Sequence, residues 1–250
     1  MFPALYHAHH SLHMEDLEFW LRLAEQQGGP VLELGCGTGR VLMALAQHGY
    51  QVYGLDRDAA MLAFLRSHTP SEQRAFIHIW QADLANFRLE KSFRLILLPC
   101  NTLSTLNLRE RKAAFNCVYQ HLAPGGVFAA SLPNPRLLSQ LPRSSNAELE
   151  ETFSSPHGEG EVRVSSMWKR TRPEFILTWI YEWQAGAGQS ERIERTVRHR
   201  LDPPYAYMQA ISGAGLIVTD TFGDFDRSPY SPDSANWIVV TQKPHKPDRA

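Results

Sequence analysis

Short apolar runs alternate with amphipathic stretches along the first half of the chain. The apolar runs lie at residues 31–34, 52–55, 76–80, 93–98 and 122–132. Stretches with apolar residues at helical spacing separate them, at residues 15–27, 40–46, 58–68 and 108–121. Strands that alternate with helices in this way predict a doubly wound α/β fold with a parallel sheet.

The pattern changes after residue 132. Residues 133–157 are rich in proline, serine and asparagine, which predicts loop or weak helix. Residues 161–200 alternate polar and apolar positions with many aromatic and β-branched side chains, which predicts antiparallel strands with a turn at Gly186-Ala187-Gly188. The α/β alternation returns with a predicted helix at 205–213 and strands at 216–222 and 237–242, expected to pair antiparallel. We therefore expect a core made of residues 1–132 and 203–243, with an insertion at 133–202.

Three glycines at alternate positions end the first apolar run. With the preceding acid they form the spacing E-x-G-x-G-x-G, carried by Glu33, Gly35, Gly37 and Gly39. A strand, a glycine turn and a helix N-terminus together suit the binding of a nucleotide-like ligand. The dinucleotide spacing G-x-G-x-x-G is not met, because its third glycine would fall on Arg40.

This stretch closely resembles the first motif of the class I S-adenosylmethionine-dependent methyltransferases. The turn Leu122–Gly126, L-x-P-G-G in form, is also similar to that family. The resemblance implies a Rossmann-like sheet of seven strands whose last pair is antiparallel, with S-adenosyl-L-methionine as cofactor. The insertion at 133–202 resembles the small β lid of some small-molecule methyltransferases.

Two acids follow the glycine turn in the order that this resemblance requires. Asp56 ends the second strand, where a carboxylate can accept hydrogen bonds from both ribose hydroxyls. It can instead cap the next helix, as Asp58 can equally well, and the resemblance favours ribose binding for Asp56 and capping for Asp58. Asp83 follows the third strand, where the resemblance implies contact with the adenine amino group and the alternative is an ordinary Asx turn. The remaining cofactor contacts expected from the resemblance are Cys36, Arg57, Met61, Ala82, Leu84 and Pro99.

The expected site of methyl transfer lies beyond the fourth strand. Ligands bind outside the carboxyl ends of strands in open α/β sheets, and Asn101 lies there in the family's fourth motif. Tyr6 matches by position an N-terminal tyrosine that covers the cofactor's methionine end, and a packing tyrosine in a flexible tail is the alternative. Candidates for a general base are His9, His10, His199 and Tyr6, of which we select Tyr6 and His199 together with Asn101 as catalytic residues.

Composition narrows the classes of function. The 250 residues carry a net charge of −1, and neither nucleic acid nor an anionic membrane is favoured as a partner. No apolar run approaches the roughly 20 residues of a membrane span, and no secretory signal is evident. Three widely spaced cysteines indicate reduced thiols in a cytoplasmic protein. The histidines of residues 1–13 have no Cys, Asp or Glu among them at ligand spacing, so no metal is expected.

The sequence therefore predicts an S-adenosylmethionine-dependent methyltransferase that acts on a nitrogen or oxygen of a small-molecule acceptor. The protein is expected to be a monomer, or a homodimer formed through the lid. The lid aromatics can line the acceptor pocket, fill the lid's own core or form a dimer contact; they are Trp168, Trp179, Tyr181 and Trp183. A non-catalytic cofactor-binding regulatory protein is an alternative on the same scaffold, and a nicotinamide-dependent oxidoreductase is a further one.

Overall fold

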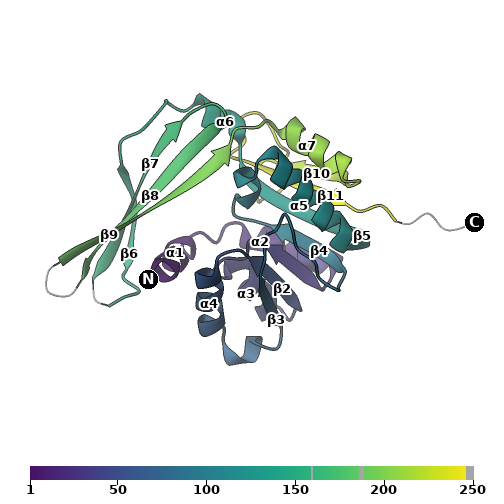
Figure 1. The fold of residues 1–250 in the computed structure, drawn as a ribbon, viewed down its shortest axis with the longest axis horizontal. Coiled ribbons are helices and arrows are strands. Elements are labelled where there is room, and N and C mark those ends of the chain that lie inside the picture. The colour runs from purple at the N-terminus through teal and green to yellow at the C-terminus, as the bar shows by residue number, and fades with distance from the viewer. Residues whose placement is uncertain (159, 186–188, 246–250) are drawn as a thin grey trace, which may run out of the picture.

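A seven-stranded sheet forms the centre of the molecule (Figure 1). The computed structural model describes residues 1–158, 160–185 and 189–245. The strand order is β10-β11-β5-β4-β1-β2-β3, and β11 runs antiparallel to both of its neighbours, whereas the other neighbouring pairs are parallel. The expected seven strands with an antiparallel last pair are thus confirmed. The strands are β1 (Val31–Leu34), β2 (Val52–Asp56), β3 (Ile77–Gln81), β4 (Phe93–Leu98), β5 (Leu122–Pro133), β10 (Ile217–Phe222) and β11 (Asn236–Gln242).

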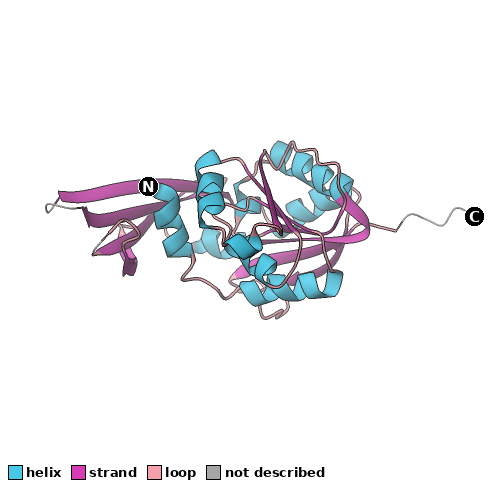
Figure 2. Ribbon diagram, turned by 90° about the horizontal axis from the view of Figure 1, so that it is seen from below, coloured by secondary structure: helices cyan, strands magenta, loops and turns pink. Residues whose placement is uncertain are grey.

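Helices cover both faces of this sheet, as Figure 2 shows. One buried apolar cluster lies beneath α2, α3 and α4, and a second lies beneath α5 and α7. Val31 belongs to the first cluster and its neighbour Leu32 to the second, because successive strand residues point to opposite faces. The helices are α2 (Leu17–Gln27), α3 (Arg40–Gln47), α4 (Ala59–His68), α5 (Leu108–His121) and α7 (Pro204–Gly213), with short 3₁₀ turns η1 (Ser71–Gln73) and η2 (Thr102–Thr105).

The insertion after β5 forms a separate antiparallel sheet, which we call the lid. It begins with α6 (Pro135–Gln140) and continues as β6 (Glu148–Ser154), β7 (Glu161–Arg170), β8 (Glu174–Ala185) and β9 (Gln189–Arg200), paired in that order. The prediction of antiparallel strands is confirmed for β7, β8 and β9. The predicted turn at Gly186-Ala187-Gly188 lies outside the described residues.

Strand β6 corrects the prediction that residues 133–157 contain only loop or weak helix. It pairs with β7 alone and carries three glutamates, one threonine and one serine among its seven residues, so its sequence lacks the apolar alternation of an inner strand. Phe153 is its only residue that is buried. An edge strand with one apolar anchor gives almost no periodic signal, because most of its side chains face water.

The first residues form a helix, α1 (Phe2–His10), that lies between the lid and the core (Figure 1). Leu5 is completely buried in the lid's apolar cluster, with Phe153 and Tyr181. On the core side, His7 Nδ1 lies 3.1 Å from the hydroxyl of Thr38. The alternative of a flexible N-terminal tail is therefore wrong. Within the described residues, no helix is long and apolar enough to cross a membrane.

Candidate active site

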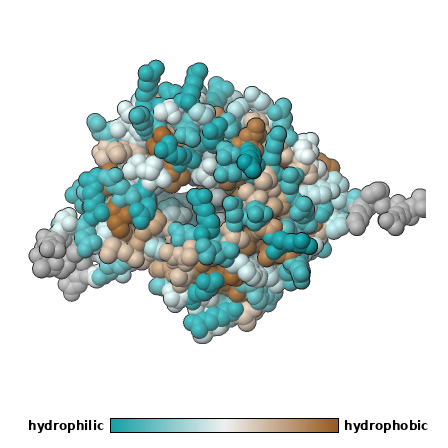
Figure 3. Space-filling model, in the orientation of Figure 1, coloured by the Kyte–Doolittle hydropathy of each residue, from teal (hydrophilic) through white to brown (hydrophobic). Residues whose placement is uncertain are grey.

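A cavity of about 230 Å³ lies at the carboxyl ends of β1, β2 and β3. Tyr6 of α1 meets the core residues in its wall. Figure 3 shows that the face of the molecule seen in Figure 1 carries hydrophilic side chains interspersed with hydrophobic patches. Residues from the glycine turn, from the loops after β2 and β3, from η2 and from α1 meet there. The lining comprises Tyr6, Gly35, Gly37, Leu55, Asp56, Arg57, Asp58, Met61, Ala82, Asp83, Leu84, Thr102, Thr105, Leu106 and Glu110.

The turn between β1 and α3 brings its backbone to the cavity wall. Gly35 and Gly37 have φ values of 68° and 53°, which side chains other than glycine rarely adopt. A Cβ on Gly35 would lie 3.3 Å from the side chain of Thr102, so η2 packs directly on the turn. The turn is therefore a narrow backbone surface held between η2 and Tyr6.

Asp56 and Asp58 have different tasks. The two carboxylate oxygens of Asp56 accept hydrogen bonds of 2.8 Å from the backbone amides of Gly37 and Asp58. Asp58 accepts from the amide of Ala60 at 2.8 Å and caps the N-terminus of α4, which confirms its expected role. Asp56 is thus fixed at the cavity wall, and each of its oxygens retains a second lone pair for a ligand hydroxyl.

Asp83 combines the two alternatives considered for it. Its Oδ1 accepts from the amide of Ala85 at 2.8 Å, which is an Asx turn. The same residue lines the cavity beside Ala82 and Leu84. The turn orients the carboxylate, and contact with an adenine amino group remains a prediction.

A second, smaller cavity of about 40 Å³ adjoins the first. Both cavities share Tyr6, Gly35, Gly37 and Thr102 as lining residues, so Tyr6 borders the space on each side. Glu33 and Cys36 line the smaller cavity, as do His7, His10, Thr38, Arg40, Val41 and Cys100. Eight of the cofactor-binding residues expected from the sequence line the larger cavity, and two more, Glu33 and Cys36, line the smaller one.

Gly39 and Pro99 line neither cavity, and their expected contact with the cofactor stays a prediction. Gly39 has a φ of 89°, and a Cβ there would lie 2.4 Å from Cδ1 of Leu65. Its glycine is needed for the close packing of α3 on α4. The residues of the larger cavity that the sequence did not single out as wall residues are Leu55, Asp58, Thr102, Thr105, Leu106 and Glu110. The last four follow β4, where the strand-end rule already indicated a site.

Glu33 is an acid buried in the wall of the smaller cavity, with 3% of its surface exposed. Burial raises the pKa of Glu33 well above its usual value; the nearby Arg40 lowers it in part, and Asp16 and Asp56 raise it further. Its Oε2 has no hydrogen-bond partner among the described residues. A buried oxygen without a partner is suited to bind a cationic or hydrogen-bond-donating group of a ligand.

Arg40 binds Asp16 through two hydrogen bonds, of 2.5 and 2.7 Å. It also donates to the carbonyl of His13 at 2.8 Å and to Sγ of Cys100 at 3.2 Å. Asp16 in turn accepts from the indole of Trp20 at 2.8 Å. Burial would lower the pKa of Arg40, but its hydrogen bonds to Asp16 outweigh this and keep the guanidinium charged. Arg40 thus joins the start of α3 to the segment before α2 and to the end of β4.

Two of the three candidate catalytic residues lie outside both cavities. Asn101 has a φ of 63°, and its carbonyl accepts from the hydroxyl of Ser104 at 2.6 Å. His199 Nδ1 lies 2.8 Å from the same hydroxyl. Because that hydroxyl donates its proton to Asn101, the His199 ring donates to Ser104. His199 therefore fastens β9 of the lid to η2, and its selection as a catalytic base is not supported.

Tyr6 and His10 are the aromatic residues that cover the cavities. Their rings stack at 3.9 Å between centroids. Burial raises the pKa of Tyr6 far above its usual value, so its phenol stays protonated and can donate a hydrogen bond but cannot act as a base. His10 Nδ1 lies 3.1 Å from the carbonyl of Tyr6, which only accepts, so Nδ1 carries the proton and Nε2 has a lone pair. Burial lowers the pKa of His10 to about 3, so the ring is neutral at neutral pH.

Stability should fall steeply in mild acid. Burial lowers the pKa values of His9 and His199 to about 4 and that of His10 to about 3. The unfolded chain takes up these protons below about pH 6.5, whereas the folded chain does not, so stability is present above that pH and is lost as the pH falls toward 4. Between these two pKa values, each histidine lowers the free energy of unfolding by about 1.4 kcal/mol for each pH unit of acidification.

Urea unfolding between pH 7.5 and 5 measures this slope. The variant His199→Gln, which cannot titrate, should reduce this slope measurably, because it removes one of the buried histidines whose pKa is lowered. A free energy of unfolding that stays constant from pH 6.5 to 5 would contradict this explanation.

Comparisons with known proteins agree on one class. Residues 31–126 match the family model of a methyltransferase domain. The chain is 22% identical over 232 residues to the putative methyltransferase YqeM of Bacillus subtilis, covering 90% of this chain and 88% of that protein. It is 27% identical to the trans-aconitate 2-methyltransferase of Delftia acidovorans, over 80% and 74% of the two chains. The crystal structure of an S-adenosylmethionine-dependent methyltransferase from Clostridium acetobutylicum superposes with a TM-score of 0.79 at 15% identity, over 93% and 92% of the two chains.

Proposed function

Because this chain belongs to the class I S-adenosylmethionine-dependent methyltransferases, we propose that it methylates a nitrogen or oxygen of a small-molecule acceptor. The observation that carries the proposal is the paired cavity at the strand ends, walled by the glycine turn and covered by Tyr6. The bound cofactor supplies a methyl group on a positively charged sulfur. The protein supplies position and exclusion of water, which together account for much of the rate in reactions of this kind.

The lining residues suit the three parts of the cofactor. Asp56 offers two fixed oxygens to the ribose hydroxyls, and Asp83 offers an acceptor to the adenine amino group. Glu33 offers its unpartnered Oε2 to the ammonium of the methionine part. Chemical fit between these donor and acceptor sets supports the assignment of Glu33, Asp56 and Asp83 as cofactor-binding residues.

The acceptor side is proposed to lie between α1, η2 and the lid. We assign residues 1–132 and 203–243 to cofactor binding and residues 133–202 to substrate binding. A relative that methylates trans-aconitate by name supports a small acceptor for this chain. His10 borders the smaller cavity with a neutral ring whose Nε2 lone pair can accept a hydrogen bond from a bound ligand, but a pKa of about 3 makes it too weak a base to take up the acceptor's proton.

A test of the proposal measures adenosylhomocysteine formed from S-adenosylmethionine with separate panels of amines, carboxylates and alcohols. Turnover with at least one small acceptor is expected. Tight adenosylhomocysteine binding without turnover on any panel would favour the non-catalytic regulatory alternative, and nicotinamide binding would favour the oxidoreductase.

Replacing Asp56 with alanine should weaken adenosylhomocysteine binding by roughly 10- to 150-fold. Loss of hydrogen bonds to a charged group costs about 1–3 kcal/mol, which corresponds to that range. Asp58→Ala should instead cost about 0.5–2 kcal/mol of stability as a lost helix cap and leave the affinity nearly unchanged. Calorimetric titrations and thermal melts of both variants separate the two effects.

The assignment of Asp56 fails if the two variants exchange these phenotypes. It fails equally if a 2′-deoxyribose analogue binds the wild type as tightly as the ribose form, since the carboxylate is proposed to hold that hydroxyl.

A further inference from the structure

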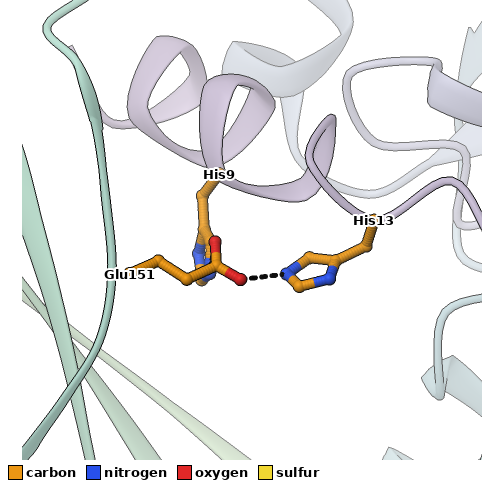
Figure 4. A group of neighbouring side chains, drawn as sticks. All are labelled: His9, His13 and Glu151. Atoms are coloured by element: carbon orange, nitrogen blue, oxygen red, sulfur yellow. Dashed lines mark ion pairs between the residues drawn. The ribbon is translucent and has the colours of Figure 1, made fainter.

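Three potential metal ligands meet where α1 ends beside β6 (Figure 4). His9 and His13 come from the N-terminal segment, and Glu151 comes from the edge strand of the lid. Their ligand atoms all lie within 4.8 Å of one another. Nε2 of His13 lies 3.1 Å from Oε1 of Glu151, and Nε2 of His9 lies 3.8 Å from Oε2.

The ring of His9 is oriented by a partner on its other nitrogen. Its Nδ1 lies 3.0 Å from the hydroxyl of Tyr181, and the His9 side chain is only 2% exposed. When Nδ1–H donates to that hydroxyl, Nε2 presents a lone pair toward Glu151. Histidines that bind metals are commonly held in this way, with the second ring nitrogen hydrogen-bonded to a fixed group.

Glu151 brings an unpartnered acceptor to the same point. Its Oε2 is buried and has no hydrogen-bond partner among the described residues. The 3.8 Å separation from His9 Nε2 is too long for a hydrogen bond. With His9 in the tautomer that donates from Nδ1 to Tyr181, two acceptor atoms face each other in a buried place, which favours a cation between them.

We propose that His9 Nε2, His13 Nε2 and a carboxylate oxygen of Glu151 bind a divalent first-row cation, with zinc as the preferred ion. Two imidazoles and one carboxylate are a ligand set typical of zinc, and water can complete a tetrahedron through the exposed side of His13. Zinc bonds of about 2.0–2.1 Å place tetrahedral ligand atoms about 3.3 Å apart. The separations of 3.1 and 3.8 Å from the two histidines to Glu151 are close to this value, and the half-exposed His13 side chain has room to adjust.

The sequence argued against a metal because no acid lies among the histidines of residues 1–13. The acid comes instead from β6, a strand that the sequence did not predict, 138 positions after His13. None of the three ligands lines either cavity, so the site is separate from the proposed methyl-transfer site and does not rest on it. A bound cation would fasten α1, which carries Tyr6, to the lid.

The test uses the whole protein, stripped with a chelator and titrated with Zn²⁺ against a chromophoric competitor. One zinc per chain and a raised melting temperature are expected. His13→Ala and Glu151→Gln should each weaken zinc binding by about 100-fold or more, because even the loss of a group that only supports a ligand costs 10- to 100-fold. His157→Ala, which removes an exposed lid histidine, is the matched control and should bind as the wild type does.

Tyr181→Phe gives an independent readout, since it keeps all three ligands and removes the group that orients His9. It should weaken zinc binding by roughly 10- to 100-fold, and Co²⁺ in the wild type should give the visible absorption of a tetrahedral site. Chelator-treated His13→Ala should melt close to the chelator-treated wild type, because the His13 side chain is half exposed, and this excludes misfolding of that variant. Zinc binding that is equal in the wild type, His13→Ala and Glu151→Gln would overturn the proposal, as would a wild type that binds no zinc.

Discussion

Replacing Gly37 with valine should abolish the binding of adenosylhomocysteine and leave the protein folded. Gly37 lines both cavities, and a Cβ there would already lie 3.9 Å from Cε1 of Tyr6. The two methyl groups of valine extend beyond that Cβ into the space between Tyr6 and the glycine turn. A loss of more than about 100-fold, or about 2.7 kcal/mol, is expected in calorimetric titration.

Backbone strain alone does not explain such a loss, and Gly49→Val provides the control. Gly49 has a φ of 82° and nothing within 4 Å of a Cβ, and it lies outside both cavities. Both variants should lose about 1–3 kcal/mol of stability from the strained backbone, and Gly49→Val alone should keep the ligand. Wild-type affinity in Gly37→Val would show that the cofactor does not lie at this turn.

Arg40→Ala should destabilise the protein by about 3–5 kcal/mol, the range for breaking a buried ion pair. The side chains of Arg40 and Asp16 are 12% and 10% exposed, and their two hydrogen bonds are short. Alanine leaves the carboxylate of Asp16 with the indole of Trp20 as its only side-chain donor among the described residues. Urea unfolding at pH 7.5 measures the free energy lost.

Arg22→Ala is the matched control for this variant. Arg22 pairs with Glu18 four residues earlier on α2, but both side chains are more than half exposed, so the loss should not exceed about 0.5 kcal/mol. Asp16→Asn combined with Arg40→Ala should cost clearly less than the sum of the two single changes, because no charge is then left unpaired. Equal losses for Arg40→Ala and Arg22→Ala would contradict the role of the buried pair.

The sequence predicted most of the main sheet because its signals are local. Predicted and observed bounds are identical for β4 and α5, where a continuous apolar run and a capping residue mark the ends. Asn107 forms a capping box with Glu110, which places the start of α5 without any help from distant residues. The glycine turn and Asp56 were predictable for the same reason, since strand, turn and helix start adjoin in the chain.

Features that depend on partners far away in the chain were missed. Helix α1 is held in place by the burial of Leu5 in the lid's apolar cluster and by the contact of His7 with Thr38 in the glycine turn. No pattern within residues 1–10 predicts these contacts. His199 was selected as a base, but its neighbour Ser104 lies 95 positions earlier. Only the fold shows that His10 borders a cavity and His199 does not.

The position of β11 has a consequence for how the chain folds as it is synthesised. This strand is the last one along the described residues, yet it lies inside the sheet, between β10 and β5. The lid strands pair only with neighbours in the chain and can form early, whereas β5 must wait for a partner that is made more than 100 residues later. Until then β5 presents a bare, largely apolar edge, so a nascent or truncated chain that lacks β11 should aggregate and depend on chaperones.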